Sequence, residues 1–364
     1  MDITPYLKLM VERNASDMYL STGAPPNVKI EGVTAPVGKT AAAPGVVKKI
    51  AASLVTEDQM KAFEESLELD TAISIPDVGR FRVNLFVQRG EVSMVVRYVK
   101  WDVPSLEQLR LPPALADLIM EPRGLIIVAG STGAGKSTTL ASMIDHRNRN
   151  KSGHILTIED PIEFIHKHNR SIVNQREVGL DTASYAEALR RAVREAPDVI
   201  MIGEIRDHDV MKQALSYADT GHLCLATLHA TNADQAMDRI INFLPDVPRE
   251  QLLMDLSLNL RAVISQRLLR STDGKRVAAT EIIQNTPYVK ALLRDGDIHK
   301  IKSAMEEAPE NVMHTFDQDI MRLYQAKKVA LEEAMEHADD SEHMRLKLRL
   351  GGHDLTGEAD DIYG

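Results

Sequence analysis

One short run of the chain has the residue types that bind phosphate. It reads Gly130-Ser131-Thr132-Gly133-Ala134-Gly135-Lys136-Ser137 and follows an apolar stretch at 125–129 that is typical of a buried strand. If a helix opens at Lys136, backbone N–H groups and the helix N-terminus converge on one anion, and the glycines let the backbone approach it. We therefore expect Lys136 to reach the β- and γ-phosphates of ATP and Ser137 to ligate Mg²⁺. The other nucleotide contacts that we expect are Ser131, Thr132, Gly133, Ala134, Gly135 and Thr138.

Carboxylates follow two further apolar runs. Glu204 comes just after the run at 199–202, and the sequence Glu159-Asp160-Pro161-Ile162-Glu163 comes after the run at 155–158. Because the carboxyl ends of parallel strands meet at one edge of a sheet, these carboxylates are expected beside the phosphate loop. Glu204 is the predicted second Mg²⁺ ligand, and one of the others is free to orient or deprotonate the attacking water. A helix cap or a salt-bridge partner is the alternative for each.

Two histidines flank a third apolar run. His222 precedes the run at 223–227 and His229 follows it, with Cys224 inside it. A zinc site is disfavoured because no second Cys/His pair supplies the missing ligands. Sensing of the γ-phosphate by polar groups at the strand edge is better motivated, and purely structural histidines are the alternative. The lone Cys224 is expected to be a buried thiol.

The elements that must position these residues alternate between strand and helix from 125 to 227, which predicts a parallel α/β sheet. Before residue 100 the pattern predicts an α+β domain with a hairpin at 80–87 and 92–99. We expect an N-terminal domain at 1–101, a linker at 102–112, an ATPase domain with a C-terminal helical lobe at 113–350, and a flexible tail at 351–364. From Arg249 onward the chain is expected to be mostly helical, with helical spacing continuing through Val263 and Ile264.

Composition limits the function classes. The net charge of −10 over 364 residues argues against a protein that coats nucleic acid, because phosphate neutralisation needs surplus Lys and Arg. No apolar stretch approaches the roughly 20 residues that cross a bilayer, and the first residues lack a leader pattern. We expect a cytoplasmic protein without direct membrane insertion, whose membrane association comes through a partner.

These four elements, in this order, resemble the Walker A, Asp box, Walker B and His box of the secretion ATPase superfamily. Ser16-Asp17-Met18-Tyr19-Leu20 and Gly79-Arg80-Phe81-Arg82-Val83-Asn84 resemble signatures of the PilT/PilU family of type IV pilus retraction ATPases, and the resemblance spans about residues 3–350. It implies a RecA-like P-loop domain and a PAS-like N-terminal domain.

The resemblance also implies site roles. Glu163 is the implied general base, Glu204 the Walker B glutamate, and His222 and His229 the His-box residues. Arginines of the N-terminal domain are expected to reach the nucleotide, and Arg82 and Arg97 are the candidates by their position in the hairpin. An exposed polar sheet face is the alternative for these two arginines.

Two departures favour the accessory PilU branch over PilT. Ser131 and Ala134 stand where PilT usually has Pro and Ser, and residues 288–296 follow the AIRxLIREGK pattern only in part. The resemblance then implies a homohexamer at the inner-membrane base of the pilus, with a PilT hexamer and the pilus platform protein as partners. An ATP-binding scaffold ring and a nucleic-acid translocase are the alternatives. An assembly ATPase would need a tetracysteine zinc motif, which a single cysteine excludes.

Overall fold

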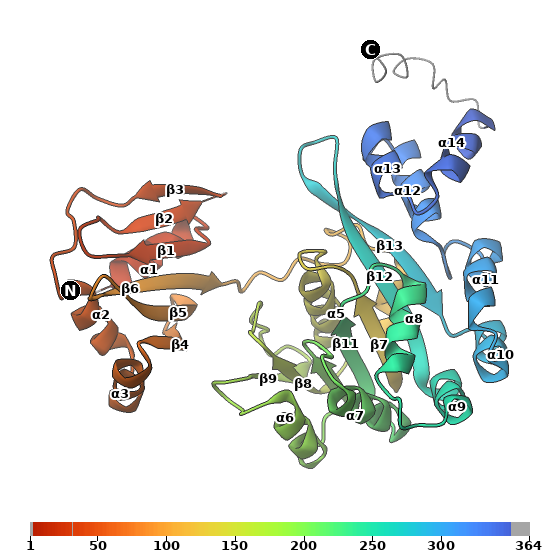
Figure 1. Ribbon diagram of the computed structural model, residues 1–364, viewed down its shortest axis with the longest axis horizontal. Coiled ribbons are helices and arrows are strands. Elements are labelled where there is room, and N and C mark those ends of the chain that lie inside the picture. Colours follow the sequence, from red (N-terminus) through yellow and green to blue (C-terminus); the bar gives the residue numbers. More distant parts are fainter. Residues whose placement is uncertain (1–2, 31, 351–364) are drawn as a thin grey trace. The chain divides into compact units, whose positions relative to one another are not determined.

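The computed structural model describes residues 3–30 and 32–350, so the tail predicted at 351–364 lies outside the described residues. The chain divides into two compact units (Figure 1). The N-terminal unit runs to Asp102 and also includes the short segment Ile162–Ile165, and the second unit contains Val103–Pro161 and the chain from His166 onward. The inclusion of Ile162–Ile165 in the first unit is a feature that the linear domain prediction does not contain.

The N-terminal unit is built on an antiparallel sheet of six strands in the order β3-β2-β1-β6-β5-β4. A capping box starts one of its helices, because the Thr56 hydroxyl accepts from the Gln59 N–H while the Gln59 side chain accepts from the Thr56 N–H. The predicted α+β domain and its hairpin are confirmed. The elements are α1 (Thr4–Glu12), β1 (Asp17–Leu20), β2 (Asn27–Ile30), β3 (Val33–Pro36), α2 (Val46–Leu54), α3 (Glu57–Ser66), β4 (Glu68–Ile75), β5 (Gly79–Gln88) and β6 (Glu91–Val99).

The second unit contains a sheet of seven strands in the order β13-β12-β7-β11-β10-β8-β9. All neighbouring pairs are parallel except β12 with β13. The predicted parallel α/β fold is therefore confirmed. Its strands are β7 (Gly124–Ala129), β8 (Gly153–Glu159), β9 (Ser171–Glu177), β10 (Val199–Ile202), β11 (Leu223–Leu228), β12 (Leu260–Arg270) and β13 (Arg276–Gln284).

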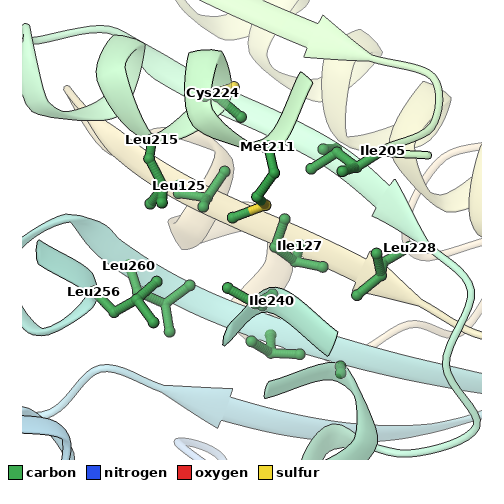
Figure 2. Packing of buried hydrophobic residues seen from close by; sticks show 14 of the residues in the cluster. Leu125, Ile127, Ile205, Met211, Leu215, Cys224, Leu228, Ile240, Leu256 and Leu260 are labelled. Atoms are coloured by element: carbon green, nitrogen blue, oxygen red, sulfur yellow. The ribbon is translucent and has the colours of Figure 1, made fainter. Parts of the chain in front are cut away.

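Helices cover both faces of this sheet. Successive residues of β7 point to opposite faces, so Leu125 and Ile127 belong to one buried cluster while Ile126 and Val128 belong to another. Figure 2 shows the first cluster, where β7, β11 and β12 pack against α7, α8 and α9, and where Cys224 of β11 is buried. Helices α4 and α5 pack on the second face. The helices up to residue 259 are α4 (Ala114–Ile119), α5 (Lys136–Asn150), α6 (Tyr185–Ala192), α7 (His208–Asp219), α8 (Ala233–Asn242) and α9 (Arg249–Asn259).

The prediction of a mostly helical chain after Arg249 is wrong for residues 260–284, and helices return from Pro287 onward. Helix α9 ends at Asn259, and the next 25 residues hold the antiparallel pair β12 and β13. Consecutive residues of β12 such as Val263 and Ile264 are both buried, because helices cover both sides of the strand. An apolar run without alternation fits a buried helix as well as a buried strand, and only the β-branched residues favoured the strand.

A C-terminal group of helices packs on the far part of the β12–β13 pair. Leu269 and Val277 of the strands share a buried cluster with Phe316, Ile320 and Leu348 of the helices. In the part of the chain that the structure describes, no helix has the length and apolar character needed to cross a membrane. The helices of this group are α12 (Phe316–Gln325), α13 (Leu331–His337) and α14 (Ser341–Leu350), whereas α10 (Pro287–Asp295) and α11 (Ile301–Glu307) pack in the first cluster.

Candidate nucleotide site

The glycine-rich loop connects β7 to α5, as its sequence predicts. The Lys136 side chain is buried, and its Nζ donates to the carbonyl oxygens of Gly130 (2.8 Å) and Ser131 (2.9 Å). Burial lowers the pKa of Lys136, and the negative charge of Glu204 opposes that shift. The ammonium group therefore sits in the loop, held by the loop's own carbonyls, where an incoming phosphate can compete for it.

Gly130 and Gly135 are required by close packing under the loop. A Cβ on Gly130 would lie 2.7 Å from the backbone oxygen of Gln266. Gly135 has φ +88°, and a Cβ there would lie 2.8 Å from Nε2 of Gln266. Any side chain at these positions would push the loop away from β12.

Gln266 of β12 holds the phosphate loop by hydrogen bonds, and the sequence did not predict this role. It is 3% exposed, its Nε2 donates to the Ala134 carbonyl (2.8 Å), and its Oε1 accepts from the Thr139 hydroxyl (2.6 Å). A buried amide with both ends bonded fixes the loop against the first turn of α5. The signal in the sequence is a polar residue just after an apolar run, but the helical spacing predicted through Ile264 does not point that residue at the loop.

Glu204 is the centre of an ionic group at the carboxyl edge of the sheet. Its Oε2 accepts from Nε of Arg206 (2.9 Å), and its Oε1 lies 3.0 Å from Nε2 of His229. Arg206 also reaches Oδ2 of Asp160 through Nη1 (3.1 Å). The hydrogen bond that Arg206 donates to Glu204 raises the pKa of Arg206. The structure thus brings Glu204, His229 and Asp160 together, and the charge of Glu204 acts on Lys136.

His222 lies at the other end of β11. The backbone N–H of Gly124, at the start of β7, donates to the His222 carbonyl. The His222 ring packs edge-on against Tyr217. A six-residue strand separates His222 from the edge that holds His229, which is about 20 Å at the rise of a β-strand. The structure does not bring His222 to the phosphate loop, because the two histidines stand at opposite ends of one strand.

Glu163, Arg82 and Arg97 belong to the N-terminal unit. Arg82 and Arg97 are directly opposite each other in the β5–β6 pair, so the two side chains share a sheet face. Nε of Arg97 donates to Oδ1 of Asp17 (2.9 Å), and this bond raises the pKa of Arg97, with a smaller contribution from Glu163. Their roles towards the nucleotide remain predictions.

A cavity of about 340 Å³ adjoins the first turn of α5. Thr138 and Thr139 line it, and Leu109, Leu111 and Leu268 supply apolar walls. Apolar walls beside a phosphate loop suit the flat base of a nucleotide. Thr138, a predicted nucleotide contact, lines this cavity.

Comparison with known proteins identifies the family. Residues 2–351 match the family model described as type II/IV secretion system protein. The chain belongs to this family of secretion ATPases. It is 47% identical to the type IV pilus ATPase PilU of Pseudomonas aeruginosa, covering 96% of this chain and 92% of the relative. Identity to PilT of the same organism is 40%, covering 93% of this chain and 98% of PilT.

Solved structures of secretion ATPases agree with the fold. The crystal structure of the pilus retraction motor PilT with bound ADP superimposes with a TM-score of 0.86 at 41% identity, covering 93% of this chain and 98% of that one. The DotB ATPase of Legionella pneumophila gives a TM-score of 0.77 at 25% identity, covering 97% of this chain and 96% of that one. The resemblance to the PilT/PilU family predicted from the sequence is confirmed.

Proposed function

We propose that this chain is a type IV pilus motor ATPase that hydrolyses ATP to power or assist pilus retraction. The observation that carries the proposal is the pairing of Glu204 with His229 and Arg206 at the sheet edge, where its charge also acts on Lys136. Phosphoryl transfer needs positioned charges around the phosphates more than covalent chemistry, and this edge supplies them. Similarity to PilU, to PilT and to a twitching motility protein of Neisseria gonorrhoeae supports the pilus assignment.

In the proposed mechanism of ATP hydrolysis, Lys136, His229 and Glu163 have separate roles. Lys136 exchanges the carbonyls of Gly130 and Ser131 for phosphate oxygens, since a charged acceptor forms the stronger hydrogen bond. His229, held by Glu204, responds to the γ-phosphate, and Glu163 orients or deprotonates the attacking water.

Magnesium is the cation that fits the proposed site. Ser137 offers a hydroxyl at an exposed position in the first turn of α5 and Glu204 a carboxylate, which are the hard oxygen ligands that Mg²⁺ prefers. When bound, Mg²⁺ neutralises charge on the phosphates. Phosphate release should stop when EDTA is added and return with excess Mg²⁺. Turnover that is insensitive to EDTA would contradict the assignment of these ligands.

We also propose a ring of six copies that works in the cytoplasm at the inner-membrane base of the pilus. A PilT hexamer and the platform protein would be the partners. Similarity to PilU and the residues Ser131 and Ala134 in the loop support an accessory role.

Counting surface pili and measuring twitching tests the accessory role. A strain lacking this chain should recover full retraction when the wild-type gene is returned, but only if PilT is also present. Retraction driven by this chain in the absence of PilT would show an autonomous motor instead. ATP turnover that rises with DNA and falls steeply with salt would redirect the assignment to nucleic-acid translocation.

A further inference from the structure

Arg267 follows Gln266 on β12 and faces the opposite side of the sheet. Gln266 holds the phosphate loop, whereas Arg267 reaches the loop that follows β11. The Arg267 side chain is 21% exposed, so its charge is mostly removed from water and must be satisfied by protein groups.

The guanidinium of Arg267 makes four contacts, which reach three parts of the second unit. Its Nη2 donates to the Thr231 carbonyl (3.2 Å) and to Oδ1 of Asp339 (2.7 Å), and its Nη1 donates to the His337 carbonyl (2.8 Å). Its Cζ lies over the ring of Phe316, at the start of α12, 4.0 Å from the ring centre. One planar group thus joins the loop after β11 to α12 and to the segment that follows α13.

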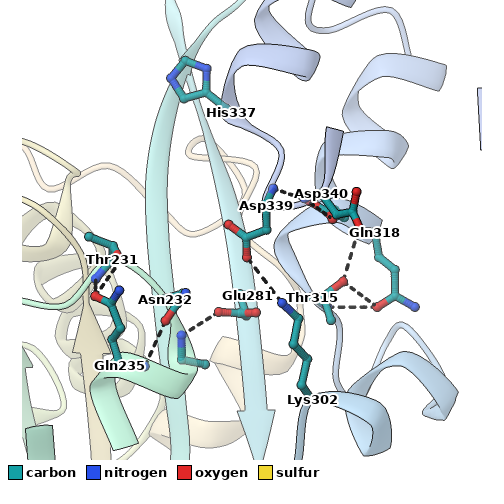
Figure 3. A network of polar contacts seen from close by, with 12 residues as sticks. Thr231, Asn232, Gln235, Glu281, Lys302, Thr315, Gln318, His337, Asp339 and Asp340 are labelled. Atoms are coloured by element: carbon teal, nitrogen blue, oxygen red, sulfur yellow. Dashed lines mark hydrogen bonds and ion pairs between the residues drawn. The ribbon is translucent and has the colours of Figure 1, made fainter. Parts of the chain in front are cut away.

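On one side, Arg267 holds a loop that includes a site residue. Two residues before Thr231, His229 pairs with Glu204. Figure 3 shows that the rest of this loop is also fixed: the Thr231 hydroxyl donates to Gln235, and the Asn232 side chain caps α8. Because this loop is short and held by hydrogen bonds, a shift of Thr231 should also move His229.

On the other side, Arg267 holds a segment tied to two C-terminal helices. The backbone N–H groups of Asp339 (2.7 Å) and Asp340 (3.1 Å) donate to the Asp317 carboxylate in the first turn of α12. Lys302 of α11 lies 3.9 Å from Oδ2 of Asp339 (Figure 3). Movement of these helices would therefore displace the acceptors of Arg267.

We propose that Arg267 is a positioning residue that couples the His229 loop to the C-terminal helices, so that the nucleotide state of the site and the arrangement of α11–α13 set each other. This inference rests on the proposed function for the role of His229, and it adds a route between the site and the helices. The coupling acts through Thr231, so Arg267 touches no reacting atom.

Hydrogen–deuterium exchange of residues 331–340 tests the coupling without requiring turnover. In the wild-type protein, a non-hydrolysable ATP analogue should change exchange in this segment. Arg267→Met keeps an apolar stem but removes all three hydrogen bonds, so the nucleotide-dependent change should disappear while the Kd for the analogue stays within about threefold. Arg267→Lys, which has no planar fork, should give an intermediate result. Arg345→Met makes the same chemical change at an exposed position of α14 and should behave like wild type.

Steady-state ATPase assays supply the second readout. For Arg267→Met we expect kcat to fall about tenfold to a hundredfold with little change in KM, because a loop misplaced by a fraction of an ångström loses transition-state contacts. The proposal is overturned if the nucleotide-dependent change in exchange persists in Arg267→Met or is absent from wild type. It is also overturned if the folded Arg267→Met variant retains the full kcat of wild type. Absence of turnover in wild type would instead count against the proposed function, and the exchange result would still decide the coupling.

Discussion

Lys136 and Gln266 are two buried polar side chains that fix the phosphate loop. Lys136 was predicted because glycines surround it at a fixed spacing, and such a motif can be recognised from the local sequence alone. Gln266 lies 127 residues beyond Thr139, its partner, so nothing local in the sequence could reveal the contact. The sequence also does not show that His222 lies away from the loop. His222 and His229 are seven residues apart, and β11 between them places the two histidines at opposite ends of one strand.

Gln266→Leu should loosen the loop while keeping the volume of the side chain. The Ala134 carbonyl and the Thr139 hydroxyl would lose their buried partners, which costs about 1–3 kcal/mol of unfolding free energy and weakens nucleotide binding. Denaturant unfolding and calorimetric titration with ADP measure the two effects. Gln284→Leu, at a half-buried position near the end of β13, is the matched control. Nucleotide affinity equal to wild type would show that Gln266 does not shape the loop.

At the level of elements, the motifs predicted the β7–α5 connection and the edge formed by β10 and β11, but not the β12–β13 pair. A strand that ends in site residues can be recognised in two ways, from its apolar run and from the polar residues that follow it. β12 has the apolar run only, and because it is buried on both faces its residues do not alternate between apolar and polar as in a half-exposed strand. The place of the segment Ile162–Ile165 was also not predictable from local sequence. It belongs to the N-terminal unit because Phe164 pairs with Lys100, which is far away in the sequence.

Glu281 joins β13 to α8, and its titration should affect the stability of that connection. Its Oε2 accepts from the N–H of Ala233 (2.6 Å), and burial raises its pKa from 4.5 to about 7. The folded protein therefore binds the proton more tightly than the unfolded chain, so this group's contribution falls as pH rises from 4.5 to about 7 and is constant above that. The loss is at most about 3 kcal/mol.

Glu281→Gln should remove this pH dependence. Relative to wild type, the variant's unfolding free energy should increase between pH 5 and pH 8, as measured by denaturant unfolding at several pH values. Glu342→Gln changes an exposed carboxylate of α14 and should leave the wild-type profile unaltered. A constant difference between Glu281→Gln and wild type over that range would disprove the raised pKa.

For the whole molecule, the proposed cycle requires the N-terminal unit to contribute charge to ATP bound at the P-loop unit. Arg82→Gln and Arg97→Gln should each lower kcat by about tenfold or more, since a positioned arginine stabilises charge that develops in the transition state. Arg82 lies on a polar sheet face, so its substitution should change unfolding little, whereas Arg97→Gln removes the partner of the buried Asp17 carboxylate and should lower stability, so kcat is measured on the folded variant. Arg13→Gln, an exposed arginine at the end of α1, is the control for assays of phosphate release. Wild-type kcat in both hairpin variants would leave these arginines with a surface role only.

The central claim is that Glu204 and its partners make this sheet edge an ATP-hydrolysing site. The most direct measurement is phosphate release at saturating ATP and Mg²⁺ by wild type and by Glu204→Gln, with nucleotide binding measured in parallel. The predicted result is steady release by wild type and a loss of about a hundredfold or more in Glu204→Gln, with ATP still bound. Equal release by the two proteins, or none by wild type although ATP binds, would contradict the account, and the second outcome would indicate a scaffold ring.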